Sequence, residues 1–172
     1  MKTTKKMLCM TVIGCAAMFA SSQAKAAVTD ADKTFLAAAA QGDMNEIKLS
    51  ELAETKASNP QVKAFAHKMV ADHKMLEAKM KPFATAWGLT APSGPDAAHQ
   101  SEWDKLNGLS GADFDAEYIN VMDQDHHQAL DAFTTEAQTT TDAKFKAAVM
   151  QGKSVVAAHT NMADDLKGKM KM

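Results

Sequence analysis

Apolar residues recur at intervals of three and four along four long stretches of this chain, and this period constrains the fold more than any other feature. In the second stretch the inward positions read Val62, Ala66, Met69, His73, Leu76, Met80, Phe83 and Trp87. Such spacing places side chains on one face of an α-helix. No stretch alternates as a strand would. The sequence therefore predicts an all-α fold in which four long helices each bury one face.

Proline, glycine and threonine residues mark the ends of the predicted helices. We expect helices over residues 32–56, 60–87, 113–138 and 142–167, with a linker over 88–112. Asn59-Pro60 separates the first pair, since proline is favoured in the first turn of a helix, and Asp142 is the expected N-cap of the fourth. A short helical piece fits residues 97–106 of the linker, and the lysine-rich tail 167–172 should fray.

The lengths of the connections favour one topology. Short links make antiparallel hairpins of helices one and two and of helices three and four. The linker of about 25 residues can travel the whole length of a helix of about 38 Å, so helices two and three can run in parallel. That is the arrangement of a ferritin-like four-helix bundle with a long crossover. An up-down bundle with a wandering loop is the alternative.

Each predicted apolar stripe contains one ionisable residue, and these are Glu46, His73, His126 and His159. A buried ionisable group is costly unless it is paired, hydrogen-bonded or bound to a metal. Imidazole is a good ligand for zinc, copper, iron and nickel, and a glutamate adds an oxygen ligand. Convergence of the four residues predicts a transition-metal site in the core. The alternative is a hydrogen-bonded network without metal.

Residues near these histidines are candidates for supporting roles. Three methionines, expected as accessory ligands, lie about one turn from a histidine: Met69, Met122 and Met162. Asp72 and Asp125 precede two of the histidines and lie about 100° round the helix from them, so they are expected to support ligands rather than bind metal. The other histidines, His67, His99 and His127, are expected at the surface or in the linker.

Counting residues from the predicted turns tests whether the four groups lie at one depth. Glu46 and His73 come out nearly level, whereas His126 and His159 are offset by about 7 Å at 1.5 Å per residue. Two arrangements therefore stay open. Either all four residues form one site, or Glu46, His73 and His126 form a cluster and His159 lies apart.

The first 26 residues have the layout of a cleaved signal peptide. Three lysines precede an apolar run over residues 7–20, and Ala24-Lys25-Ala26 offers the small residues of a cleavage site. We expect export to the periplasm and a single domain over residues 27–172. Alternatively, Val12-Ile-Gly-Cys15 resembles a bacterial lipobox and would place a lipid anchor on Cys15.

The composition of residues 27–172 narrows the possible partners. Both cysteines, Cys9 and Cys15, lie in the signal segment, so no disulfide is expected after cleavage. The remaining 15 basic and 21 acidic residues give a net charge of −6, and arginine is absent, which makes nucleic acid an unfavourable partner. No apolar run reaches the roughly 20 residues of a transmembrane helix. The sequence leaves an envelope protein partner and the oligomeric state open.

Four strings of this sequence carry a resemblance to a known family. They are Phe35-Leu-Ala-Ala-Ala-Ala-Gln-Gly-Asp-Met-Asn-Glu46, Val62-Lys-Ala-Phe-Ala-His-Lys-Met-Val-Ala-Asp72-His73, Phe114-Asp-Ala-Glu-Tyr118 leading to Asp125-His126, and His159-Thr-Asn-Met-Ala163. Together they resemble the domain of unknown function 4142 family, whose polar positions fall on Glu46, Asp72, His73, His126 and His159. The resemblance implies a ferritin-like bundle in an exported bacterial protein, often labelled an outer membrane protein, with no established activity.

The sequence departs from the ferritin-like di-iron pattern. That pattern uses Glu-x-x-His motifs, but Val70 and Asp123 occupy the positions three residues before His73 and His126. A histidine-rich mononuclear site therefore fits better, and no reactive cysteine or convincing Ser/His/Asp set supports nucleophilic catalysis. Our leading hypothesis is metal binding for metal handling or envelope stress tolerance. The alternatives are a structural or partner-binding bundle and, less favoured, a redox enzyme using the same metal.

Overall fold

The computed structural model describes residues 27–170, which form five helices and contain no strand. The helices are α1 (Asp30–Lys56), α2 (Pro60–Ala86), α3 (Ala97–Gly108), α4 (Gly111–Thr139) and α5 (Ala143–Met170). The all-α prediction is confirmed. None of the described helices has an apolar stretch long enough to cross a membrane. The expected signal peptide over residues 1–26, including Cys15, lies outside the described residues.

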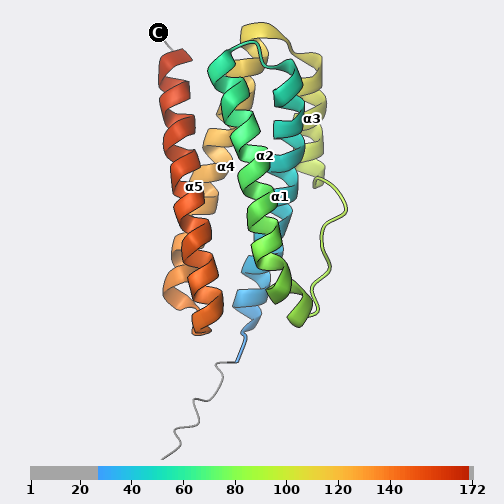
Figure 1. Cartoon of the computed structure of the whole chain (residues 1–172). Helices are drawn as coiled ribbons and strands as arrows, with labels where there is room; N and C mark the ends of the chain where they lie inside the picture. Colours follow the sequence, from blue (N-terminus) through green and yellow to red (C-terminus); the bar gives the residue numbers. More distant parts are fainter. Residues whose placement is uncertain (1–26, 171–172) are drawn as a thin grey trace, which may run out of the picture.

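The four long helices lie side by side as two antiparallel hairpins (Figure 1). α1 packs most extensively on α2, and α4 packs most extensively on α5. The segment after α2 returns along the molecule, so α2 and α4 run in the same direction, and α3 packs against α1 and α4 (Figure 1). The similarity to ferritin-like bundles in particular stays a prediction.

The structure shifts several of the expected helix boundaries by one to three residues. α3 coincides with the short helical piece expected over residues 97–106 and extends it to Gly108, and α4 begins at Gly111 instead of residue 113. α5 continues to Met170, so the expected fraying is wrong for residues 167–170, and residues 171–172 lie outside the described part of the chain. The last turns of α5 are held because Met170 packs against the core and the Lys169 ammonium lies 2.6 Å from an Asp165 carboxylate oxygen.

Polar side chains satisfy the free N–H groups where the helices begin. The Asn59 side chain accepts a hydrogen bond from the backbone N–H of Gln61, and Pro60, which has no N–H, occupies the first position of α2. Asp142 accepts the N–H groups of Lys144 and Phe145 at 2.9 Å each. Asp142 therefore makes the hydrogen bonds expected of an N-cap.

The apolar core is divided into two clusters by a polar layer. On α1, for example, Leu36 belongs to one cluster and Leu49 to the other, with Glu46 between them. On α4, His126 lies between Met122 in one cluster and Phe133 in the other. The same order holds on α2 and α5, so each long helix contributes its ionisable residue at the boundary between the two clusters.

Candidate metal centre

The structure brings the four predicted site residues together, one from each long helix. Glu46, His73, His126 and His159 are all buried, with exposed fractions of 5%, 2%, 0% and 0%. One nitrogen from each of the three histidine rings lies within 4.8 Å of the corresponding nitrogens of the other two. The arrangement in which His159 lies apart is therefore excluded.

The predicted offset of about 7 Å between His126 and His159 is not found between their rings, because a residue count along the backbone ignores the direction of the side chains. In an α-helix each side chain leans toward the N-terminus of its own helix. α4 and α5 are antiparallel, so the two imidazoles lean toward each other along the bundle axis. As a result His126 Nε2 and His159 Nδ1 lie 3.3 Å apart.

Each histidine uses one ring nitrogen to donate a hydrogen bond away from the group. His126 Nδ1 donates to the Met122 carbonyl at 2.9 Å. His159 Nε2 donates to Asp72 at 2.8 Å, and His73 Nδ1 donates to Asp43 at 2.8 Å. Because carbonyl and carboxylate oxygens accept, these contacts place a proton on the outer nitrogen of each ring.

The second nitrogen of each ring, called the inner nitrogen here, points toward the other two histidines. If each ring carries a single proton, on its outer nitrogen, His126 Nε2 and His159 Nδ1 present two lone pairs to each other across 3.3 Å. Two lone pairs cannot form a hydrogen bond, so a stable contact needs an extra proton or a cation between them. Zinc bound tetrahedrally at about 2.0–2.1 Å keeps neighbouring nitrogens about 3.3 Å apart. The spacing of these two nitrogens therefore fits a shared metal ion.

Glu46 lies beside the histidines without joining the compact group of three. Its Oε2 is 2.9 Å from His73 Nε2, yet this contact lies outside hydrogen-bonding directions and leaves Nε2 without a hydrogen-bond partner. Its Oε1 is 3.4 Å from His126 Nδ1. The predicted four-residue set is thus a trio of histidines with one carboxylate at its edge.

Burial and pairing set the charges of the group. Burial lowers the pKa of His73, but the Glu46 and Asp43 carboxylates outweigh it and raise this pKa to about 10. Burial raises the pKa of Glu46, yet the neighbouring histidines lower it to about 2. Burial lowers the pKa of His159 to about 4 against the opposing effect of Asp72. In the absence of metal, charged His73 thus pairs with Glu46, and His159 is neutral.

Of the three methionines and two aspartates predicted to support the site, only Asp72 hydrogen-bonds to one of the three histidines through its side chain. Met69 and Met122 are fully buried in the apolar cluster on one side of the polar layer, and Met162 packs against the same cluster. Met122 approaches the site through its backbone carbonyl. Asp72 accepts from His159, whereas Asp125 lies 3.3 Å from His99.

Two parts of the site were missed by sequence reasoning. Asp43 orients His73, and its position one turn before Glu46 on the same helix face was a signal that could have found it. His99 was expected in the linker or at the surface, but it is partly buried and contacts Asp96 and Asn45 as well as Asp125. The contacts to Asn45 and Asp125 join α3 to α1 and α4, so no pattern within α3 itself reveals them.

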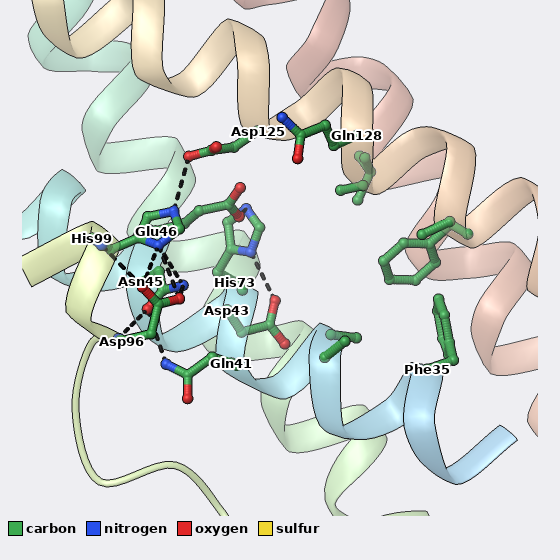
Figure 2. A pocket seen from close by; sticks show the side chains of 17 residues that line it. Phe35, Gln41, Asp43, Asn45, Glu46, His73, Asp96, His99, Asp125 and Gln128 are labelled. Atoms are coloured by element: carbon green, nitrogen blue, oxygen red, sulfur yellow. Dashed lines mark hydrogen bonds and ion pairs between the residues drawn. The ribbon is translucent and has the colours of Figure 1, made fainter. Parts of the chain in front are cut away.

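A pocket of about 460 Å³ opens between α1 and α4 and reaches the edge of the histidine group (Figure 2). Glu46 and His73 line its polar end together with Asp43, and the α3 residues Asp96 and His99 lie beside them. The buried group therefore has a path to solvent.

Fold and site together define an all-α protein with a buried layer of histidines and carboxylates across its long helices. The chain matches the model of the Domain of unknown function (DUF4142) over residues 17–166 and belongs to that family. None of the curated proteins matches it.

Solved structures of three bacterial proteins are similar in fold. A DUF305 protein from Streptomyces coelicolor, described as secreted, has a TM-score of 0.70 at 15% identity, covering 82% of this chain and 92% of its own. A DUF305 fragment from Deinococcus radiodurans gives 0.69 at 12%, covering 83% and 97%. The conserved hypothetical protein rv2844 from Mycobacterium tuberculosis gives 0.62 at 15%, covering 80% and 91%. At these identities the likeness concerns the fold alone.

Proposed function

We propose that this protein is exported to the periplasm and binds one transition-metal ion through His73, His126 and His159, with Glu46 at the edge of the site. The role is metal handling or envelope stress tolerance, without catalytic turnover. The observation that carries the proposal is the convergence of one ring nitrogen from each of the three histidines within 4.8 Å of one another, with those of His126 and His159 facing each other at 3.3 Å. The description of the Streptomyces neighbour as secreted supports the proposed location.

The hydrogen bonds around the histidines support a metal site in particular. Metal-binding histidines commonly donate their other ring N–H to a carboxylate or a backbone carbonyl, which fixes the tautomer and the ring orientation. Here Asp43, Asp72 and the Met122 carbonyl receive those three N–H groups. The second ring nitrogen of each histidine thus points into the group, and that of His73 becomes a ligand once it has lost its proton on metal binding.

The donor set favours some metals over others. Imidazole and carboxylate ligands suit zinc, copper(II), nickel and iron, whereas copper(I) prefers sulfur. The methionine side chains pack in the apolar cluster beside the site, so the nearest donors are nitrogen and oxygen. We therefore expect zinc or copper(II) to bind more tightly than copper(I).

Metal content and thermal unfolding test the proposal on residues 27–172, which include every described helix. The protein is treated with a chelator, and zinc, copper, iron or nickel is then added back singly. We expect about one equivalent of one metal to bind. At a hundredfold excess over Kd, binding adds about 2.7 kcal/mol and raises the unfolding temperature by roughly 5–10 °C.

One variant and a matched control test where the metal binds. His159→Gln keeps an amide that can reach Asp72 but removes the ligand nitrogen, and it should abolish both uptake and stabilisation. His127→Gln is the control, because His127 is exposed and belongs to a separate surface group with Asp123 and Asp164. Uptake that survives His159→Gln but is lost in His127→Gln would place the metal at the surface and overturn the proposal.

A structural or partner-binding role is the second candidate, and one observation favours it. Charged His73 lies between Asp43 and Glu46 at 2.8 and 2.9 Å, and this ion-paired arrangement forms without a metal. Under this alternative no metal stabilises the wild-type protein, and His159→Gln changes its stability alone.

A further inference from the structure

The pocket between α1 and α4 extends well beyond the residues of the metal centre, as far as Phe35 and Phe133. The facing positions of the two helices carry small residues, including Ala39 and Gly42 on α1 and Ala129 and Ala132 on α4. Because these side chains end at Cβ or are absent, the space between the helices stays open. Its volume of about 460 Å³ falls within the range of small-molecule sites.

The two ends of this pocket differ in chemistry. Figure 2 shows the carboxylates and histidines gathered toward one end and Phe35 at the other. Phe133 and Val156 add apolar surface to the lining, and the Phe35 and Phe133 rings meet edge to face with centroids 4.9 Å apart. A ligand that fills the pocket must therefore be amphipathic.

The charged side chains at the polar end indicate which charge a ligand of this pocket should have. Four carboxylates line the pocket, those of Asp43, Glu46, Asp96 and Asp125, against two histidines and no lysine. Asp43 is matched by His73 and Asp96 by His99, each at 2.9 Å or less. Asp125 has only the longer contact of 3.3 Å to His99. An anion would thus meet uncompensated negative charge, whereas a cation would be attracted.

We infer that this pocket binds a small organic amine, with its ammonium group beside Asp125 and its aromatic or short aliphatic body against Phe35 and Phe133. An ammonium supplies up to three N–H donors, and the Asp125 carboxylate, with its single longer contact to His99, can accept from it. An aromatic body gains further stabilisation from edge-to-face contacts with the two phenylalanine rings. Glu46 and His73 of the metal centre line the same pocket, but the inference does not depend on the metal proposal, because Asp125, Phe35 and Phe133 are not among the proposed metal ligands.

Three probes of similar size test the inference on residues 27–172 in the presence of a chelator. They are phenethylamine, the neutral 2-phenylethanol and the anionic 3-phenylpropanoate, and their affinities are compared by calorimetry. We expect the amine to bind about tenfold more tightly than the alcohol and the carboxylate not to bind. Amide chemical shifts should change for residues 35–46 and 125–133. Equal affinity for the amine and the alcohol would overturn the inference.

Two variants and a control separate the ends of the pocket. Asp125→Asn removes the charge and should weaken amine binding about tenfold, while Ala129→Leu fills the pocket and should weaken both the amine and the alcohol. Asp165→Asn makes the same charge change on α5, outside the pocket, and should have no effect. An unchanged affinity in Ala129→Leu, or an equal loss in Asp165→Asn, would show that the amine binds elsewhere.

Discussion

Replacing Gly152 by alanine should destabilise the protein although alanine is the better helix former. Gly152 lies within α5, where a Cβ atom would come within 2.4 Å of Phe133 Cε1 and 3.2 Å of Cζ. Carbon atoms prefer separations of about 3.5–4.0 Å, so the ring edge must move by about 1 Å. Phe35 contacts this ring edge to face at a centroid distance of 4.9 Å and resists the movement.

The matched substitution Gly42→Ala isolates the cost of this contact. Gly42 also lies inside a long helix, and its added Cβ would meet nothing within 4 Å. Both substitutions gain up to about 1 kcal/mol of helix propensity, which cancels when the two are compared. Overpacking costs about 1–3 kcal/mol, so Gly152→Ala should be about 2 kcal/mol less stable than Gly42→Ala.

Urea unfolding followed by circular dichroism measures this difference directly. For a domain of this size, a difference of about 2 kcal/mol corresponds to roughly 6 °C in the unfolding temperature. Phe133→Leu should remove most of the penalty of Gly152→Ala, because leucine presents no ring edge at that position. Equal stabilisation by the two glycine substitutions, or an additive double variant, would refute the reasoning.

Two further predictions concern buried polar groups outside the metal centre. Burial and the nearby Asp32 carboxylate raise the pKa of Glu136 to about 7, above its unfolded value of about 4.5. The protonated carboxyl of Glu136 is therefore favoured by folding, and its contribution to the free energy of unfolding is present below about pH 4.5 and lost as pH rises to 7. Glu136→Gln should be about 1–2 kcal/mol more stable than wild type at pH 8 and equal to it at pH 4.5. Urea unfolding at the two pH values measures both differences. Ser50 and Tyr118 share a hydrogen bond of 2.8 Å between fully buried hydroxyls, so Tyr118→Phe should cost about 1–3 kcal/mol. Adding Ser50→Ala should recover part of that loss in thermal unfolding, and a simple sum of the two losses would contradict the pairing.

The sequence predicted the helical fold and the polar layer because both depend on periodicity. Glu46, His73, His126 and His159 each interrupt an apolar stripe, and a residue on a buried stripe must point into the core. The helix ends were less predictable. The last turn of α5, for instance, has Met170 packed against an apolar cluster that several helices build together.

The remaining parts of the site depend on geometry that periodicity does not contain. The closeness of His126 and His159 arises from the opposite lean of side chains on antiparallel helices, which residue counting ignores. The contacts of His99 depend on where the crossover places α3. The pocket exists because small residues happen to face one another across α1 and α4, and pairing of faces is a tertiary property.

The division of the polar layer between two hairpins has a consequence for folding kinetics. Glu46 and His73 reside on the first hairpin, and His126 and His159 on the second. Contacts within each hairpin are local in sequence and can form early, whereas the buried layer closes only when the hairpins dock. Dehydration of these groups is therefore concentrated in one late step, and we expect substitutions among them to change the unfolding rate more than the folding rate.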